Sequence, residues 1–234
     1  MAPLAIDLYC GLGGWTEGLL AEGYTVIGFD IERHVYGEHR YPAQLVLQDV
    51  RTLHGRQFKD AALIVASPPC QGYSYRAMPW KRAKALPPPD NSLFEACFRI
   101  QREASEAAGH HVPLIVENVK GAQPYVGRSR WNFASFHLWG DVPALMPMTV
   151  KNAVMKPGIT HRADGSTNFH GHNVDGTKFH ASGRAWFDLG PALYPSGSAR
   201  RKAASAMMAK IPLPLARHIA RTYHPQQSEV SCRE

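Results

Sequence analysis

The chain has 234 residues, of which 44% are hydrophobic and 19% charged, so it can bury a core of ordinary size. Gly and Pro follow no fixed period and no apolar run reaches about 18 residues, which excludes a collagen-like chain and predicts no membrane-spanning helix. The net charge of +7 comes from residues 151–234, with 12 Lys and Arg against 5 Asp and Glu, whereas residues 1–150 hold 14 of each. This asymmetry favours contact with a polyanion, most often nucleic acid, although a solvated basic tail would give the same count.

Strands and helices are expected to alternate along the first 150 residues. A strand at 4–9 leads through the glycine-rich turn 10–14 into a helix at 17–22, followed by a strand at 24–29, a helix at 33–39 and strands at 44–48 and 61–66. A helix at 91–109 and strands at 113–116 and 131–136 come next. Such alternation predicts an α/β fold with a mostly parallel sheet and helices on both faces.

The last third of the chain has a different character. Residues 150–198 are rich in Gly, His, Asn and Thr and predict a small irregular module, and helical character returns over 203–223 with breaks at Pro212 and Pro214. We therefore expect three parts: residues 1–149, 150–198 and 199–234. The four cysteines lack the spacing of a zinc site or a disulfide scaffold, and the N-terminus does not look like a signal peptide. These features predict a reducing, cytoplasmic setting and no metal.

Polar residues recur where the predicted parallel strands end, which is where such sheets bind ligands. The turn around Gly11, Gly13 and Gly14 follows the first strand, and Asp30 follows the second, 16 residues after Gly14. Glycines let a backbone approach a ligand closely, and an acid at the second position accepts hydrogen bonds from ribose hydroxyls, so the pair favours an adenosine-type ligand. A structural tight turn explains the glycines alone equally well. The spacing differs from G-x-G-x-x-G, which disfavours a nicotinamide or flavin cofactor.

Two further strand ends carry groups suited to covalent chemistry. Pro68 and Pro69 stiffen the exit of one strand and hold Cys70 at a fixed place, where its thiolate can act as a nucleophile, although a lone cysteine is more often inert. Glu117 ends the next strand and can donate a hydrogen bond or a proton there. Taken alone, this glutamate would be read as a helix cap or a surface acid.

Together these residues resemble the DNA (cytosine-5) methyltransferases over residues 6–139 and again over 203–220. Matching segments occur in the family's order: the cofactor turn 7–15, Asp30, Asp49, the nucleophile motif 69–71, the Glu-Asn-Val motif 117–119 and the Arg-x-Arg motif 128–130. The resemblance implies a Rossmann-like sheet that uses S-adenosylmethionine, with a target-recognition module at 150–198. It also implies double-stranded DNA as the partner and a base flipped out of the duplex.

The resemblance assigns each residue a role. Cys70 attacks carbon 6 of cytosine, Glu117 stabilises the adduct at ring nitrogen 3, Arg130 holds the exocyclic oxygen and Arg128 helps to order the cleft. The methyl group moves to carbon 5. Cofactor contacts are assigned to Asp7, Tyr9, Cys10, Gly11, Gly13, Gly14, Asp30, Ile31, Asp49, Val50, Pro69, Leu93 and Lys210. The basic and aromatic segment 71–89 suits a lid over DNA, and Arg200, Arg201 and Lys202 suit phosphate contacts.

The sequence departs from the family at several positions. Val126 replaces the usual Gln ahead of the Arg-x-Arg motif, and residues 208–212 read Met-Ala-Lys-Ile-Pro instead of Gly-Asn-x-Val-Pro. Lys210 near the donor's sulfonium would favour a carboxylated S-adenosylmethionine and transfer of a carboxymethyl group; a lysine facing solvent or phosphate is the plainer interpretation. The histidines His161, His170, His172 and His180 match no known zinc spacing, so DNA or solvent contacts are expected.

Other functions stay open at this point. The same chemistry on RNA cytosine is one, a DNA-binding module without catalysis is a second, and a nicotinamide-dependent oxidoreductase is a third. Cys70 and Glu117 argue against the binding module, and the glycine spacing and Cys70 argue against the oxidoreductase. The sequence predicts a monomeric DNA methyltransferase in a bacterial or phage-infected cell.

Overall fold

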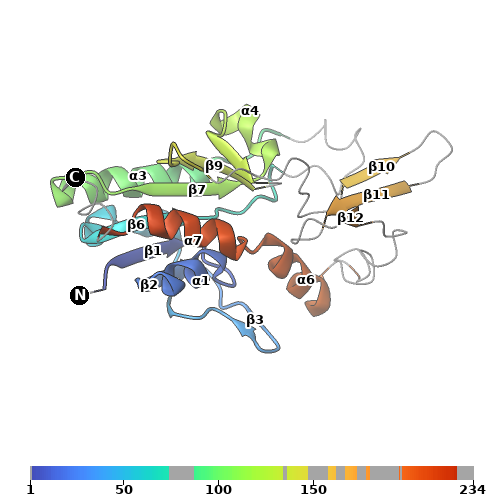
Figure 1. Cartoon of the computed structure of the whole chain (residues 1–234), viewed down its shortest axis with the longest axis horizontal. Coiled ribbons are helices and arrows are strands. Elements are labelled where there is room, and N and C mark those ends of the chain that lie inside the picture. The colour runs from blue at the N-terminus through green and yellow to red at the C-terminus, as the bar shows by residue number, and fades with distance from the viewer. Residues whose placement is uncertain are drawn as a thin grey trace. The chain divides into compact units, whose positions relative to one another are not determined.

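The computed structural model describes residues 2–73, 87–133, 136–146, 158–161, 167–172, 178–179, 195 and 197–225; Figure 1 labels their elements. The chain divides into two compact units. Unit 1 comprises residues 1–132, 136–146 and 211–234, and unit 2 comprises residues 133–135 and 147–210. The division into 1–149, 150–198 and 199–234 stays a prediction, and Lys210 belongs to unit 2.

The main sheet has seven strands in the order β5-β2-β1-β6-β7-β9-β8. Their bounds are β1 Leu4–Leu8, β2 Thr25–Asp30, β5 Gln44–Leu47, β6 Ala61–Ala66, β7 Leu114–Asn118, β8 Trp131–Phe133 and β9 Phe136–Gly140. The first five in this order pair in parallel, and β9 runs antiparallel to β7. Central strands such as β6 (AALIVA) are almost wholly buried and apolar, as expected for strands covered on both faces.

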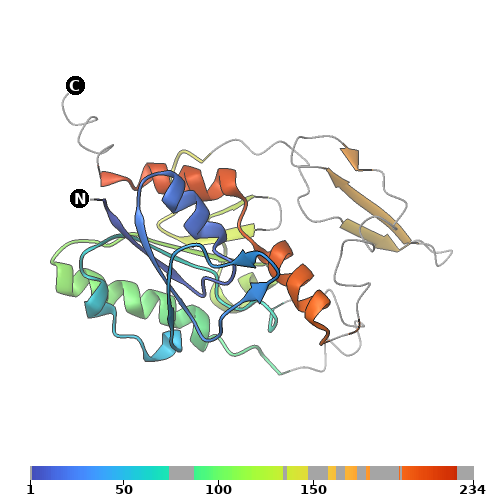
Figure 2. The ribbon, with the colours of Figure 1, turned by 90° about the horizontal axis from the view of Figure 1, so that it is seen from below.

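Helices cover both faces of this sheet. Helices α1 (Gly14–Ala21) and α7 (Leu213–Thr222) pack against each other on one face, and α3 (Ser92–Ala108) lies on the other (Figure 2). The short helices η1 (Val50–Thr52), η2 (Gly55–Phe58), η4 (Lys120–Ala122) and α4 (Gln123–Val126) complete this part. The predicted α/β, Rossmann-like architecture with a largely parallel sheet is confirmed.

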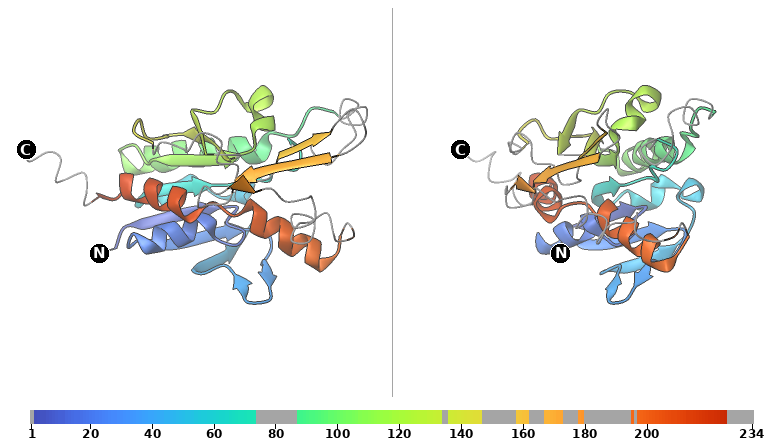
Figure 3. Two further views of the ribbon diagram at one scale, coloured as in Figure 1. Left: turned by 45° about the vertical axis from the view of Figure 1, so that its right-hand side comes forward. Right: turned by 90° about the vertical axis from the view of Figure 1, so that its right-hand side faces the viewer.

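One predicted helix is wrong. Residues 33–39 form no helix; instead β3 (Val35–Tyr36) and β4 (His39–Arg40) pair as an antiparallel hairpin. Gly37 has a φ of 62° at the first position of the two-residue turn, a conformation that glycine adopts without strain. In both views of Figure 3 the hairpin projects away from the main sheet.

Two strand boundaries also differ from prediction. The expected strand at 131–136 is replaced by β8 and β9, and β9 supplies an antiparallel partner to β7 that the sequence reading missed. Glu117 does not leave its strand but is the fourth residue of β7, where it is 8% exposed. The long helix was predicted closely, since α3 runs between Asn91 and Gly109 as its caps.

Unit 2 contains more regular structure than expected. Strands β10 (Gly158–His161), β11 (Thr167–His172) and β12 (Lys178–Phe179) form an antiparallel sheet, so the prediction of an irregular module is wrong there. Helix α6 (Ala199–Ala209) begins four residues earlier than predicted, and the Ser198 hydroxyl accepts a hydrogen bond from the Arg201 N–H at its start. Among the described helices, none is long and apolar enough to cross a membrane.

Candidate active site

The strand order reverses between β1 and β6, where the main sheet turns from one half to the other. The loops that follow these two strands, residues 9–13 and 67–73, therefore leave the same edge of the sheet side by side. In open α/β sheets ligands bind at this reversal. The predicted cofactor turn and the predicted nucleophile are thus brought to one edge.

The cofactor turn is tight on one side and open on the other. Tyr9, Gly11 and Gly13 all have positive φ angles, of 58°, 50° and 77°. A Cβ at Gly13 would lie 2.6 Å from Pro42 Cδ, so only glycine fits there. A Cβ at Gly11 would meet nothing within 4 Å, so the backbone at Gly11 faces open space. This is the arrangement that lets a ligand approach a main chain closely.

Asp30 ties the cofactor turn to β2. Its Oδ2 accepts the Gly11 N–H at 2.9 Å, and its Oδ1 accepts the N–H groups of Ile31 at 2.8 Å and Glu32 at 3.3 Å. His34 Nε2 lies 3.6 Å from Oδ1. Burial raises the pKa of this carboxyl, but the hydrogen bonds from His34 and the backbone outweigh it and lower the pKa overall, so Asp30 is ionised. The Gly11 N–H uses one lone pair of Oδ2.

Other predicted cofactor residues lie around the same turn. The Tyr9 hydroxyl donates to the Leu93 carbonyl at 2.8 Å, which joins the turn to α3. Ile31 is 72% exposed beside Asp30, whereas Val50 is buried. Asp49 caps η1 and forms a two-pronged ion pair with Arg51, with Arg51 Nη2 2.7 Å from Oδ2. Hydrogen bonds from Arg51 hold the pKa of Asp49 below its usual value.

Asp7, which the sequence analysis assigned to the cofactor, lies beneath the turn. Its Oδ2 accepts the Thr16 hydroxyl at 2.6 Å, and the Thr16 hydroxyl lies 2.7 Å from the Tyr41 hydroxyl. Its Oδ1 is buried without a hydrogen-bond partner. Burial raises the pKa of Asp7 to about 7, the Thr16 hydrogen bond opposes this, and the Asp30 charge adds to it. The side chain therefore supports the turn from below, and Cys10 and Gly14 are buried beside it.

Cys70 is presented on a braced turn. Its carbonyl accepts the Tyr73 N–H at 3.0 Å, and the Tyr73 side chain is buried with its hydroxyl donating to Asn91 Oδ1 at 2.9 Å. A Cβ at Gly121 would lie 2.2 Å from the Tyr73 carbonyl oxygen, so the turn packs directly on the helix that follows the Glu-Asn-Val motif. Pro69 is exposed next to Cys70.

The described cysteines differ in exposure. Cys70 is partly exposed, whereas Cys10 and Cys97 are buried. Burial raises the pKa of the Cys10 and Cys97 thiols far above the usual range, which removes the thiolate that a nucleophile requires. Among the three, Cys70 is the one that solvent reaches.

Glu117 and Asn118 end the strand next to Cys70. β6 and β7 pair Ala66 with Val116, so Glu117 and Ser67 follow the same rung of the ladder. The Asn118 amide Nδ2 donates to the Pro68 carbonyl at 3.0 Å, and its Oδ1 accepts the Val119 N–H at 2.8 Å. Sequence reasoning noted Asn118 only as part of a motif; its side chain clamps the Pro-Pro-Cys segment.

The Arg-x-Arg motif lies in the loop between α4 and β8. Arg128 and Arg130 are both exposed, so their guanidinium groups are accessible from solvent. The side chains that hold this loop, Gln123 and His137, were not singled out from the sequence. Both lie on neighbouring elements, α4 and β9, whose positions the sequence reading did not foresee.

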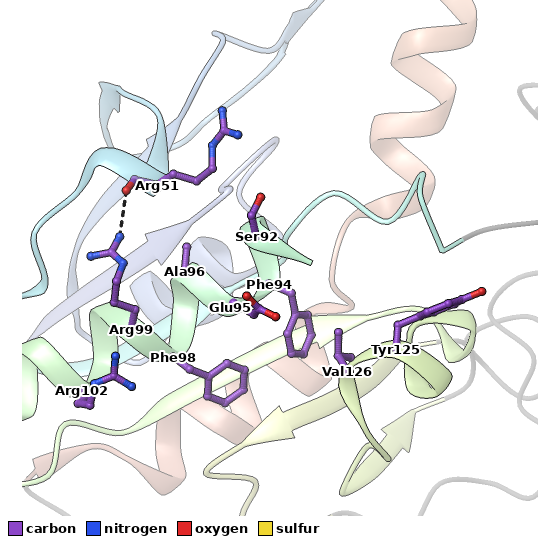
Figure 4. Close-up of a pocket in the computed structure, with 10 residues that line it drawn as sticks. All are labelled: Arg51, Ser92, Phe94, Glu95, Ala96, Phe98, Arg99, Arg102, Tyr125 and Val126. Atoms are coloured by element: carbon purple, nitrogen blue, oxygen red, sulfur yellow. Dashed lines mark hydrogen bonds between the residues drawn. The ribbon is translucent and has the colours of Figure 1, made fainter. Parts of the chain in front are cut away.

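A separate groove of about 780 Å³ runs along α3 (Figure 4). Arg51 and Arg99 lie toward one end, where Arg99 Nη2 donates to the Arg51 carbonyl at 3.0 Å, and Tyr125 lies at the other. None of the predicted catalytic residues lines this groove. The groove is therefore separate from the predicted catalytic residues.

Some predicted sites lie outside the described residues. The proposed lid is described only at 71–73 and 87–89, and His180 is not described. His161, His170 and His172 lie on β10 and β11, where the backbone alone is described. In the described part of the chain no cluster of His, Cys, Asp and Glu is arranged to hold a metal.

Comparison with known proteins identifies the family. The sequence profile of the C-5 cytosine-specific DNA methylases matches residues 4–125, which spans both the cofactor turn and the Glu-Asn-Val motif. The chain belongs to this family. A curated relative, the Type II methyltransferase M.DdeI of Desulfomicrobium norvegicum, is 28% identical over 134 residues. That alignment covers 53% of this chain and 30% of the relative, so this chain matches less than a third of the relative's length.

Solved structures with similarity include two methyltransferases. One, described as a DNA modification methyltransferase encoded within an E. coli prophage, is 26% identical, covers 54% of this chain and 35% of that chain, and has a TM-score of 0.37. The other is the Entamoeba histolytica methyltransferase EhMeth, which is 18% identical, covers 54% of this chain and 41% of that chain, and has a TM-score of 0.39.

Proposed function

We propose that this protein methylates carbon 5 of cytosine in DNA, with Cys70 as the nucleophile. The observation that carries the proposal is the half-buried Cys70 thiol, held on a braced turn that follows β6, the strand paired with the one that carries Glu117. Family membership supports the same reaction.

The chemistry follows from the groups at this edge. The Cys70 thiolate adds to carbon 6 of the base, which makes carbon 5 electron-rich enough to accept a methyl group. Glu117 stabilises the adduct through a hydrogen bond at ring nitrogen 3, and Arg130 holds the exocyclic oxygen. Carbon 5 then releases its proton to solvent, the electrons of that bond restore the double bond to carbon 6, the carbon–sulfur bond breaks, and Cys70 leaves as thiolate. The base must leave the duplex to reach Cys70.

The residues present fit S-adenosylmethionine. Gly11 exposes its backbone to open space, and Asp30 keeps an acceptor for a ribose hydroxyl. Tyr9, Ile31 and Leu93 flank the same turn and would contact the adenosine part. When bound, this cofactor supplies the methyl group as an electrophile. A carboxylated donor bound through Lys210 is not favoured by anything in the structure.

The charge distribution supports a nucleic-acid substrate. Unit 2 carries nine Lys and Arg against three Asp, so it accounts for +6 of the net charge of +7. Arg200, Arg201 and Lys202 stand in the first turn of α6, where the helix dipole disfavours cations. A phosphate bound at that turn would offset this repulsion. We propose double-stranded DNA as the partner and target recognition as the role of residues 150–198.

The test is mass spectrometry of nucleosides from DNA incubated with the protein and S-adenosylmethionine. We expect 5-methyldeoxycytidine with the unmodified protein and none with Cys70→Ala. A DNA strand containing 5-fluorocytosine should form a covalent adduct with the unmodified protein, because fluorine cannot leave carbon 5 as a proton does.

Cys97→Ala is the matched control. It removes a buried thiol whose pKa is raised by burial, so this variant should still form the methylated product and the covalent adduct. Methylation that survives Cys70→Ala would overturn the assignment of the nucleophile. Modified cytosine in RNA alone would favour the RNA enzyme, and DNA binding without any product would favour a binding module.

A further inference from the structure

The loop that carries Arg128 and Arg130 is held at both of its ends. The Trp139 indole N–H donates to the Gly127 carbonyl at 2.9 Å, and the Arg130 N–H donates to the Leu138 carbonyl at 2.8 Å. Both partners belong to β9, the antiparallel neighbour of β7. The two arginines are therefore positioned by the strand that flanks Glu117.

A chain of three side chains holds the middle of the loop. Gln123 Oε1 accepts both the backbone N–H and the hydroxyl of Ser129, each at 3.2 Å. The Ser129 hydroxyl also lies 2.9 Å from His137 Nδ1. These contacts connect α4, the loop and β9.

The direction of each hydrogen bond can be assigned. The Ser129 backbone N–H is always a donor, so the amide of Gln123 must present its oxygen. The Ser129 hydroxyl donates its proton to that oxygen, and His137 Nδ1 must then donate to Ser129 Oγ. Burial of His137, which is 8% exposed, and the nearby Lys120 cation lower the pKa of the imidazole, so the ring is neutral with a single N–H. Every donor in the chain thus has an acceptor.

The same strand pair anchors the nucleophile. His137 on β9 is the register partner of Asn118 on β7, and Asn118 holds the Pro68 carbonyl two residues before Cys70. Val126, which stands where the family resemblance expects Gln, packs against the hydrophobic core. Gln123, three residues earlier, provides the loop with an amide that position 126 lacks.

We propose that Gln123, Ser129 and His137 are positioning residues that set the Arg-x-Arg pair against the base. Gln123, three residues before Val126, supplies the amide that holds Ser129. This inference rests on the proposed function, because it assigns the side chains that hold Arg128 and Arg130 ready for the cytosine adduct.

The test separates methyl transfer from cofactor binding. Gln123→Met keeps the side-chain length and removes the acceptor, so kcat should fall about tenfold, the order expected for one or two lost hydrogen bonds. His137→Leu should lower kcat similarly. His137→Asn restores a donor near the place of Nδ1 and should recover most of the rate. The KM for S-adenosylmethionine should stay within about twofold in all three, because the cofactor turn is untouched.

Gln101→Met is the matched control. Gln101 also makes two hydrogen bonds, to the Val112 carbonyl at 3.1 Å and Asp141 Oδ2 at 2.7 Å, but it braces the opposite end of β7. The Gln101→Met protein should be less stable to heat and should have an unchanged kcat. Equal kcat in Gln101→Met, Gln123→Met and His137→Leu would overturn the inference while the proposed function stands. A kcat of His137→Asn no higher than that of His137→Leu would also overturn it. Absence of methylation by the unmodified protein would overturn both.

Discussion

Asp7 is a buried carboxyl group near the carboxyl end of β1, with one oxygen bound by Thr16 and the other without a partner. Burial raises its pKa from the ordinary 3.8 to about 7. Between these values the folded protein binds a proton that the unfolded chain releases. The contribution of Asp7 to stability is therefore fully present below about pH 4 and is lost as the pH rises toward 7.

Asp7→Asn removes this titration. We expect the unfolding free energy of the unmodified protein to fall more between pH 5 and pH 8 than that of Asp7→Asn, by roughly 3 kcal/mol. Urea unfolding at both pH values measures the difference, and the exposed Asp60→Asn should behave like the unmodified protein. Parallel pH dependence in the unmodified protein and Asp7→Asn would show that Asp7 is ionised throughout.

Asn118 provides a second prediction at the scale of single residues. Asn118→Asp removes the donor to the Pro68 carbonyl and places a charge beside it, so adduct formation with 5-fluorocytosine DNA should slow about tenfold or more. Asn91→Asp is the control, because an Asp oxygen still accepts the Tyr73 hydroxyl. Equal slowing in both variants would mean that the Pro68 clamp does not position Cys70.

The sequence predicted the positions of some single residues but not their hydrogen-bond partners. The sequence predicted that Cys70 and Glu117 lie at one edge of the sheet because parallel strands end at a common edge, a rule that needs only strand positions; their catalytic roles stay predictions. Asp30 and Asp49 were assigned to the cofactor, yet in the structure Gly11 and Arg51 also occupy their oxygens. Whether they also contact the cofactor stays a prediction. Such partners depend on the path of the backbone, which residue spacing does not specify.

At the scale of elements, the strongly patterned segments were predicted well. α3 buries Phe94, Cys97 and Ile100 at helical spacing, and its ends lie within one residue of the predicted bounds 91 and 109. The helix predicted at residues 33–39 was wrong because Gly37 and Glu38 make a two-residue turn between very short strands. The strand β9 was missed because the buried His137 interrupts its apolar run. Short strands gain their stability from neighbours, so their own sequence is a weak signal.

The crossing of α1 and α7 gives a prediction at this scale. A Cβ at Gly18 would lie 2.4 Å from Ala216 Cβ and 2.6 Å from the Ala216 carbonyl carbon, so the two helices touch there through their backbones. In an open helix Gly→Ala stabilises by about 1 kcal/mol. Here the overlap with α7 should make the substitution destabilising, and Gly18→Ala should lower the free energy of unfolding by about 1 to 3 kcal/mol.

Thermal unfolding measures this effect, with Glu106→Ala on the exposed face of α3 as the control for helix propensity. Glu106→Ala should change stability by less than about 0.5 kcal/mol. A Gly18→Ala protein as stable as the unmodified one would mean that α7 can shift away from α1. Glu22, the C-cap residue of α1, forms ion pairs with Arg217 and Arg221 of α7. Such a shift should therefore also break those ion pairs.

At the scale of the whole molecule, the predicted catalytic residues and the excess positive charge lie in different units. The cofactor turn, Cys70, Glu117 and the Arg-x-Arg motif lie in unit 1, and nearly all of the excess positive charge lies in unit 2. This division suggests that cofactor binding and DNA affinity can be separated.

Replacing residues 147–210 by a short Gly-Ser linker tests the division. His218 on α7 bonds to the Leu145 carbonyl at 3.1 Å, so the chain leaves unit 1 beside the helix by which it returns. Ile211 precedes His218 by two extended residues and about 8 Å of α7, or about 14 Å along the chain, and roughly eight flexible residues span that distance. The shortened protein should bind S-adenosylmethionine as the full chain does, measured by calorimetry.

DNA affinity should respond differently. Loss of nine cations should weaken binding and flatten the dependence of log K on log salt, since fewer phosphates are neutralised. Fluorescence anisotropy at several salt concentrations measures that slope, and the full chain with Arg200→Ala and Arg201→Ala should lie between the two. An unchanged slope in the shortened protein would place the DNA contacts on unit 1. A folded shortened protein that fails to bind the cofactor would instead show that unit 2 contributes to the cofactor site, where Lys210 is the first residue to replace.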